Sequence, residues 1–510
     1  MHKITSKFTT GLHKLQRTER ATGTTPNLAS LESSIYRYRK QRGVNLGSWF
    51  VLERWITDAP FRNAASPAQS DLDVARGADA RQVLETHYDA WVTEKDWEWI
   101  SDLGLNTVRI PIGYYHLCGT DPSVLSGTDF AQFGDVFAGA WSRLIKAIET
   151  AERFGLGVLL DLHAAPGKQN NDAHAGTSNP AAFFKDNRHR EHTIHVLRTL
   201  VTHLNAHTPP LVNIVGIELL NEPHPSTDAE LHKWYTAAIK DLAALDPTLP
   251  IYLGDCWKTE QYAEYIKSTA KPTLLVLDHH LYRCFTPSDI STPAPAHAHA
   301  LTDEGAHTPR MFARVSEMLD SAGAGLVVGE WSGALNPGSL TGSPDDTKNY
   351  VAAQLRLYEA HCSGNFFWTY KKQGARPDRG WCLRDAVAAG IFPSRVGLFA
   401  SKNPEGDHER QARVRDGLKD KALGEHTAYW SKFPGKYQHA RFAEGFTLGW
   451  DDAYRFFTSS SPHVSELGFV GAWARIRTND HGSSFWEFQH GFKQGVAAAR
   501  TDFRRCYCSE

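Results

Sequence analysis

Residues 215–223 read Val-Gly-Ile-Glu-Leu-Leu-Asn-Glu-Pro and lead from an apolar run into a polar turn. The apolar run up to Leu220 is short, which favours a buried strand over a helix. Pro223 has no N–H to donate to a sheet ladder, so the strand ends before it. Asn221 and Glu222 then stand where a strand leaves the sheet, and in a β/α barrel that rim carries catalysis. An isolated Asn-Glu-Pro is more often a solvated turn, so the rest of the chain has to decide between the two interpretations.

Apolar runs of similar length recur along the chain and alternate with segments of helical periodicity. Residues 80–103 are expected to form one helix, because apolar side chains recur on one face and Gly104 suits a helix C-terminus. The segment Cys284–Thr308, rich in Pro, Ala and His, is expected to be a loop. Eight strands that are each followed by a helix predict an α/β fold, the (β/α)8 TIM barrel. The expected strands are 42–49, 106–112, 157–162, 214–220, 250–253, 273–277, 324–328 and 365–369.

The end of the chain does not continue this alternation. Asn403–Glu425 is rich in charge and predicts a solvated helix. An aromatic-x-x-Gly-Phe-x-x-Gly pattern occurs at Phe442–Gly449 and again at Phe488–Gly495, which indicates two similar helices that pack closely through glycine. Two copies are too few for a solenoid. We therefore expect three parts: a leader or disordered segment (residues 1–40), the catalytic barrel (residues 41–399) and a mainly helical C-terminal extension packed on the barrel (residues 400–510).

Composition excludes several classes of partner. Lys and Arg number 55 against 57 Asp and Glu, so the net charge of −2 gives no electrostatic case for nucleic acid. No apolar run reaches the roughly 18 residues of a transmembrane segment.

The seven cysteines are odd in number and include no Cys-x-x-Cys pair, which favours reduced thiols in an intracellular protein and disfavours a structural zinc site. No secretory signal peptide is recognisable; residues 1–20 are either a disordered start in a cytoplasmic protein or a weak mitochondrial presequence. The oligomeric state stays open.

Polar and aromatic side chains stand at the end of every expected strand. Singly, each has a structural explanation, such as a core histidine, an arginine paired with a structural aspartate, or a packing tryptophan. Together they would face one another across one end of the barrel, which packing does not require. These residues are Glu53, Arg109, Asp161, His163, Asn221, Glu222, Asp255, Trp257, Asp278, His280, Tyr282, Glu330, Trp331, Trp368 and Tyr370.

Two of them, Glu222 and Glu330, suit the hydrolysis of a glycoside. That reaction needs a proton donor for the leaving oxygen and a second carboxylate across the sugar ring. When the two carboxyl groups lie about 5–5.5 Å apart, the second attacks C1 directly and the configuration is retained. Arg109 would hold the nucleophile ionised, since a nearby positive charge lowers a carboxylate pKa. Asn221 can bond the sugar 2-hydroxyl, and Trp368 offers a flat face for the ring.

Seven motifs, in order over about residues 40–395, resemble glycoside hydrolase family 5, and within it the fungal exo-β-1,3-glucanase branch and its intracellular fungal homologues. The motifs are Arg42-Gly-Val-Asn-Leu-Gly-Ser-Trp-Phe-Val-Leu-Glu53, Val108-Arg-Ile-Pro-Ile-Gly-Tyr114, Asp161-Leu-His-Ala-Ala-Pro-Gly-Lys-Gln-Asn170, Leu220-Asn-Glu-Pro223, Asp278-His-His-Leu-Tyr282, Gly329-Glu-Trp331 and Phe366-Phe-Trp-Thr369.

The resemblance implies a retaining β-glycosidase that acts on a carbohydrate or glycoside by double displacement, exo-acting on β-glucosides and without a metal or other cofactor. It places Glu222 in the acid/base position and Glu330 in the nucleophile position, and Glu53 where the exo-acting branch grips the terminal glucose. The residues matching substrate-binding positions are Arg109, His163, Asn221, His280, Tyr282 and Trp368. The motifs depart from the branch at Arg54, Ala164 and Lys168, so the substrate stays open between β-1,3-glucan fragments and glucosylated small molecules or lipids.

Two other classes of function compete with this prediction. A metal-dependent barrel hydrolase could draw on His163, His174, Asp278, His279 and His280. Two observations speak against this class. The first strand lacks a His-x-His motif, and the candidate residues do not make up a full set of ligands for a metal ion. The alternative is a non-catalytic carbohydrate-binding or scaffold protein on a family 5 barrel. Against that one, an idle site need not keep Glu222, Glu330, Arg109 and Asn221 together.

Overall fold

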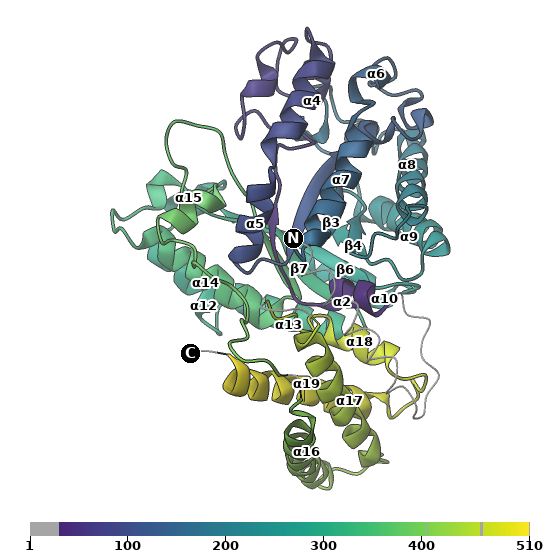
Figure 1. Ribbon diagram of the computed structural model, residues 1–510, viewed down its shortest axis with the longest axis vertical. Coiled ribbons are helices and arrows are strands. Elements are labelled where there is room, and N and C mark those ends of the chain that lie inside the picture. Colours follow the sequence, from purple (N-terminus) through teal and green to yellow (C-terminus); the bar gives the residue numbers. More distant parts are fainter. Residues whose placement is uncertain (1–29, 405, 460–462, 509–510) are drawn as a thin grey trace.

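Eight parallel strands close a barrel in the computed structural model, which describes residues 30–404, 406–459 and 463–508 (Figure 1). Each strand pairs with the next along the chain, and β8 pairs with β1, which confirms the predicted TIM barrel. Nearly every strand residue is buried, as expected for a parallel sheet covered by helices. The strands are β1 (Gln41–Asn45), β2 (Thr107–Gly113), β3 (Gly157–Ala164), β4 (Ile214–Glu218), β5 (Ile251–Gly254), β6 (Leu275–Arg283), β7 (Gly325–Leu335) and β8 (Gly364–Phe367).

Helices follow every strand and form the outer layer. After β1 to β4 come α3 (Asp71–Ala75), α4 (Ala80–Trp91), α5 (Glu94–Asp102), α6 (Gly134–Phe137), α7 (Ala140–Arg153), α8 (Asn187–Asn205) and α9 (Asp228–Leu245). After β5 to β8 come α10 (Thr259–Ser268), α11 (Pro287–Ser291), α12 (Ala294–Thr302), α13 (His307–Ser321), α14 (Asp346–His361) and α15 (Leu383–Ala388). None of the helices in the described part of the chain is long and apolar enough to cross a membrane.

Two local predictions were wrong for reasons of capping. Residues 80–103 form two helices instead of one, because extended Thr93 caps α5 and its N–H donates to the carboxylate of Asp96 at 2.8 Å. The segment Cys284–Thr308 is not a loop: Thr286 and Asp289 cap α11 reciprocally, and α12 follows. In α12 the apolar face is narrow, with Leu301 buried, so its periodicity is hard to see in the sequence.

The segment expected to be a leader is ordered in part. Residues 30–40 include helix α2 (Leu31–Tyr38), which Ser30 caps by accepting the N–H of Ser33 at 3.2 Å. Arg37 reaches the barrel and donates to the carbonyl of Ile214 at the start of β4. The predicted presequence at residues 1–20 lies outside the described residues.

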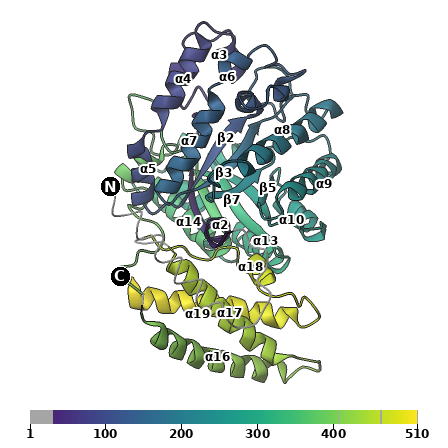
Figure 2. The ribbon, with the colours of Figure 1, turned by 45° about the vertical axis from the view of Figure 1, so that its right-hand side comes forward.

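The C-terminal helices are α16 (His408–Trp430), α17 (His439–Phe457), α18 (Val470–Ile476) and α19 (Phe485–Tyr507), and they lie together on one side of the barrel (Figures 1 and 2). The paired glycine pattern is explained by α17 and α19. A Cβ on Gly445 would lie 2.0 Å from the carbonyl oxygen of Phe488, and a Cβ on Gly491 would lie 2.0 Å from that of Phe442. Close packing of two helices through glycine is therefore confirmed.

This helical region touches the amino-terminal ends of the strands. Phe469 and Trp473 join a buried cluster with Val215, Tyr252 and Val327, each of which lies in the first three residues of its strand. Arg42 of β1 also forms a buried ion pair with Glu466 at 2.6 Å. The strands finish at the opposite end of the barrel. The division of the chain at residues 399 and 400 stays a prediction.

Candidate active site

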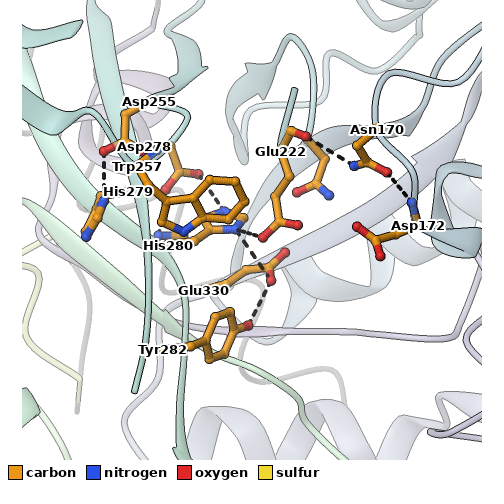
Figure 3. Close-up of polar contacts among 12 residues, drawn as sticks. Asn170, Asp172, Glu222, Asp255, Trp257, Asp278, His279, His280, Tyr282 and Glu330 are labelled. Carbon is orange, nitrogen blue, oxygen red and sulfur yellow. Dashed lines mark hydrogen bonds and ion pairs between the residues drawn. The ribbon is translucent and has the colours of Figure 1, made fainter. Parts of the chain in front are cut away.

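Glu222 follows β4 on a backbone held in an uncommon conformation. Its φ is +42°, in the left-handed region that costs a non-glycine residue about 1–3 kcal/mol. Asn170 donates to the carbonyl of Glu222 at 3.1 Å and helps to hold this turn. The side chain points into the barrel mouth, where His280 Nδ1 lies 2.8 Å from Glu222 Oε1 (Figure 3).

Glu330 of β7 lies beside it. Arg109 Nη1 donates to Glu330 Oε1 at 2.9 Å. The hydroxyl of Tyr282 donates to Glu330 Oε2 at 2.8 Å (Figure 3). His280 Nδ1 also lies 3.5 Å from Glu330 Oε2, so this one imidazole borders both carboxylates. A carboxylate oxygen of Glu222 and one of Glu330 lie within 4.8 Å of each other.

Arg109 of β2 is the centre of the polar interior. Its guanidinium is fully buried and donates to Glu218 Oε2 at 2.7 Å as well as to Glu330. It also lies 3.1 Å from Asp161 Oδ2 and donates to Asn221 Oδ1 at 2.8 Å. One cation therefore serves three buried carboxylates, and no single one of them receives its full charge.

His163, Asn221 and Trp368 line the same end of the barrel. His163 Nδ1 lies 2.6 Å from Asp161 Oδ2, and its ring is stacked on Trp368 at 7° between planes. Burial, with Arg109 nearby, lowers the pKa of His163 well below its usual value, so the ring is neutral. Its Nδ1 then carries the proton toward Asp161, and its Nε2 faces the amide of Asn221 at 3.4 Å.

Glu53, in the loop after β1, belongs to the same group. Its carboxylate accepts the indole N–H of Trp55 at 2.7 Å and is largely buried. Burial raises the pKa of Glu53 to about 8, and the charges of Glu330 and Glu222 push it in the same direction. All nine residues predicted for the site thus border one region at the carboxyl ends of the strands.

The pKa of Glu330 is not lowered, although the sequence led us to expect that Arg109 would lower it. Burial raises the pKa of Glu330 to about 7, against the opposing pull of His280 and Arg109. Burial likewise raises the pKa of Glu222, with His174 and Arg109 opposing. A shared proton is best placed on Glu222, because Glu330 alone accepts hydrogen bonds from Arg109 and Tyr282, and these favour its ionised form.

The five residues of the metal-dependent alternative do not form one cluster, although the ring centroids of His163 and His174 lie 4.9 Å apart. His279 turns away and pairs with Asp255 at 2.7 Å. Glu222, His280 and Glu330 do bring three donor atoms within 4.8 Å of one another. Arg109 Nη1, however, lies 2.9 Å from Glu330 Oε1, so a metal ion bound there would stand beside a fixed positive charge that repels it.

Several residues of this network were not singled out from the sequence. Glu218 was missed, although a charged residue inside an apolar strand is a signal of an inward-facing polar group. Asn45 donates to the carbonyl of Gly329, beside Glu330, at 2.8 Å and accepts from Arg109 at 3.0 Å. Nothing in the sequence indicated that Trp55 would contact Glu53, because that contact depends on the path of the loop after β1.

Replacing Arg109 with Met is expected to destabilise the fold by at least about 3–5 kcal/mol at neutral pH, the cost of leaving buried charges without a partner. Burial already raises the pKa of Asp161 to about 7 and raises that of Glu218, and both would rise further without the guanidinium. The folded variant then binds more protons than the unfolded chain, so its stability falls as pH rises from about 4.

The measurement is urea unfolding of the wild type and Arg109→Met at about pH 5 and pH 8, with a larger deficit at pH 8. Arg143→Met is the control, because Arg143 pairs with exposed Asp89 and such pairs contribute at most about 1 kcal/mol. Equal stability of Arg109→Met and the wild type at pH 8 would contradict the prediction.

Comparison with known proteins agrees with this geometry. The family model "Cellulase (glycosyl hydrolase family 5)" matches residues 76–374, and the model "Glucan 1,3-beta-glucosidase 3 C-terminal domain" matches residues 411–503. The chain is 29% identical over 476 residues to "Glucan 1,3-beta-glucosidase 3" of Schizosaccharomyces pombe, covering 90% of this chain and 95% of the relative. It is 30% identical over 492 residues to an uncharacterised glycosyl hydrolase of Saccharomyces cerevisiae, covering 91% of each.

Among solved structures, rutinosidase from Aspergillus niger shares the fold, with a TM-score of 0.56 and 20% identity over 70% of this chain and 99% of that one. The family match spans more than half of the chain and contains seven of its eight strands, β2 to β8. The chain therefore belongs to glycosyl hydrolase family 5 and is a glycoside hydrolase.

Proposed function

We propose that this glycoside hydrolase is a retaining, exo-acting β-glucosidase that works by double displacement. The observation that carries the proposal is the close pair Glu222 and Glu330, with carboxylate oxygens within 4.8 Å of each other. Retaining enzymes hold their two carboxyl groups about 5–5.5 Å apart, whereas inverting enzymes need about 6.5–9.5 Å to admit a water molecule. The relatives named glucan 1,3-beta-glucosidase support a β-glucoside as the substrate.

In the first step, the Glu330 carboxylate attacks C1 while Glu222 gives its proton to the leaving oxygen. In the second, Glu222 takes a proton from water, which attacks C1 and releases Glu330. Arg109 and Tyr282 hold the attacking carboxylate, and His280 lies between the two glutamates. Asn221, fixed by Arg109, is placed to bond the sugar 2-hydroxyl.

Glu53, Trp55 and Trp368 support exo action on a terminal glucose. Besides burial, the charges of Glu330 and Glu222 raise the pKa of Glu53, so its carboxylate lies near both proposed catalytic groups and offers hydrogen-bonding oxygens to one side of the sugar site. Trp55 fixes it, and Trp368 offers an aromatic face beside His163. A sugar site that is closed at one end, with oxygens there to accept hydrogen bonds from sugar hydroxyls, suits the non-reducing end of a glucan chain.

The test is hydrolysis of 4-nitrophenyl β-D-glucoside by the purified protein, followed by NMR of the first-formed sugar. β-Glucose as the first product would support retention, and α-glucose would refute it. With laminaripentaose, glucose and laminaritetraose in equal amounts as the only early products would support exo action, and early laminaribiose together with laminaritriose would refute it. Glu330→Gln serves as the inactive control.

The intracellular location predicted from the sequence is also proposed here. All seven cysteines are free, with Cys118, Cys362 and Cys382 buried. Free thiols in this number are common in reducing compartments. The natural substrate of such an enzyme would be a short β-glucoside that reaches the inside of the cell.

Removing the hydroxyl of Tyr282 is expected to shift the acid limb of the pH profile of kcat/KM. Activity requires ionised Glu330, so it falls as pH drops through the pKa of that group. The Tyr282 hydrogen bond favours the anion, and its loss therefore raises the pKa and moves the acid limb to higher pH. A hydrogen bond to a charged group is worth about 1.5–3 kcal/mol, or about 1–2 pH units.

The measurement is the pH profile of the wild type, Tyr282→Phe and the control Tyr265→Phe, whose hydroxyl pairs with Thr236 on the outer helices. An unchanged acid limb in Tyr282→Phe, or a shift to lower pH, would show that the prediction is wrong.

A further inference from the structure

Three helices of the C-terminal region bring two imidazoles and a carboxylate to one point. His426 lies near the end of α16, His439 begins α17 and Glu487 lies in the first turn of α19. His426 Nε2 is 3.1 Å from Glu487 Oε2, and His439 Nδ1 is 3.0 Å from the same oxygen. All three donor atoms lie within 4.8 Å of one another. The cluster is on the opposite side of the barrel from the site described above, and no part of the proposed reaction uses it.

The carboxylate of this cluster is buried and ionised. The side chains of His426 and Glu487 are each 1% exposed, and that of His439 is 27% exposed. Burial alone would raise the pKa of Glu487, but the backbone N–H of Gln438 and the two imidazoles hold it below its usual value. Glu487 Oε1 accepts the backbone N–H of Gln438, so the carboxylate is fixed in position between the two imidazoles.

Aromatic rings surround the cluster and limit the access of water. Phe442 is stacked on His426 with ring centroids 4.2 Å apart, and Tyr437 lies parallel to His439 at 5.6 Å. The ring of Trp486 also lies against His426 at 5.9 Å. A positive ion is attracted more strongly by a carboxylate in such a setting than in water, because the surrounding dielectric constant is low.

The imidazole of His426 would change its tautomer on binding a metal ion. Its Nδ1 is buried and has no hydrogen-bond partner among the described residues. In the metal-free protein Nε2 donates to the ionised carboxylate of Glu487, so on metal binding the ring proton would move to Nδ1 and the Nε2 lone pair would face the ion.

Donor type and spacing point to a borderline transition metal. Zn²⁺ binds imidazole nitrogen at about 2.0–2.1 Å and carboxylate oxygen at about 2.0–2.2 Å, which in a tetrahedral site puts neighbouring donors a little over 3 Å apart. The two measured separations, 3.1 and 3.0 Å, are close to that value. We propose that His426, His439 and Glu487 form a binding site for one divalent transition metal ion, with Zn²⁺ as the best match.

The ion would fasten α16 to the rest of the molecule. Among the residues of α16 only Gln411 and His426 are buried, and its apolar contacts come from half-buried side chains, Val414, Ala422 and Leu423. A metal bound to one ligand from each of α16, α17 and α19 would join the three helices at one end. The fourth position would be taken by water or by His490, one turn along α19, whose ring centroid is 5.5 Å from that of His426.

The test separates a metal site from a hydrogen-bonded cluster by two isosteric changes. In His439→Asn the amide nitrogen takes the place of Nδ1, and in His426→Gln it takes the place of Nε2, so both variants can still donate to Glu487. An amide nitrogen does not coordinate Zn²⁺. Full-length protein, freed of metal with EDTA and dialysed, is titrated with Zn²⁺ at neutral pH by calorimetry, and its Tm is measured with and without the ion.

The wild type is expected to bind one Zn²⁺ per chain with a rise in Tm. In each variant we expect the affinity to fall by more than about 100-fold, the upper end of the loss seen when only an outer-shell partner is changed. The controls are His408→Asn at the exposed start of α16 and Glu330→Gln in the barrel, and both should bind as the wild type does.

Absence of Zn²⁺ binding by the wild type would overturn the proposal and leave a hydrogen-bonded cluster. Unchanged binding by His439→Asn, or binding lost in Glu330→Gln instead, would also overturn it, since the ion would then lie elsewhere. If buried His426→Gln fails to fold, partly exposed His439→Asn decides the question alone.

Discussion

Glu330→Gln is expected to lower kcat/KM for an aryl β-glucoside by at least about 10⁴-fold, because the amide cannot attack C1 and no other group in the site can form the covalent intermediate. The fold should persist. The amide is nearly isosteric, and its oxygen can still accept from Arg109 Nη1, which lies 2.9 Å from Glu330 Oε1. Since burial raises the pKa of Glu330 to about 7, removing its charge costs the folded state little at neutral pH.

The measurement pairs steady-state kinetics with chemical rescue of a smaller variant. Glu330→Ala leaves room for azide on the face of the sugar from which Glu330 would attack, so added azide should yield α-glucosyl azide from an activated aryl β-glucoside. Glu317→Gln is the matched control, because the side chain of Glu317 is exposed on α13, and it should retain full activity. Activity of Glu330→Gln within tenfold of the wild type would show that another group is the nucleophile.

Most of the barrel could be predicted because its signals are local. Short apolar runs, the prolines and glycines that end them, and the helical periodicity between them are all visible within a few residues. The nine predicted site residues lie together because parallel strands of a barrel end on the same face, so a position at the end of a strand already fixes a position in space. Glu222 and Glu330 are 108 residues apart in the chain and adjacent in the structure for that reason.

The parts that could not be predicted depend on contacts between distant segments. Trp55 is fixed by the path of the loop after β1, and Glu218 by its turn toward Arg109 in the barrel interior. The pKa of Glu330 was expected to be low, yet Arg109 divides its charge among several buried carboxylates and burial dominates.

The cluster of His426, His439 and Glu487 was missed for the same reason. Its ligands come from three separate helices at spacings of no known motif, and the sequence argument considered only cysteine pairs and the histidines of the barrel as metal ligands. Only the crossing of α17 and α19 through glycine, together with the packing of α16 against them, brings these ligands together.

Glu222→Ala is expected to reduce activity to a degree set by the leaving group. A sugar or alkyl leaving group needs the proton of Glu222, and its loss should slow cleavage by about 10²–10⁴-fold. A dinitrophenyl leaving group needs no proton, so attack by Glu330 continues and the glycosyl-enzyme accumulates, since water has lost its general base. The progress curve should then show a burst of dinitrophenol followed by slow turnover.

Azide should relieve that slow step, because it needs no base, and it should give β-glucosyl azide by attack on the glycosyl-enzyme. The opposite configurations from Glu222→Ala and Glu330→Ala would assign the two roles independently of rate. Glu264→Ala on α10 is the control, since its side chain is exposed and far from the barrel mouth. Equal losses for dinitrophenyl and alkyl glucosides would contradict the acid/base role, because a residue that only supports the fold has no reason to distinguish leaving groups. The strained φ of +42° would then be the better explanation of any loss, and Glu222→Gln, which keeps the side-chain shape, should restore the activity.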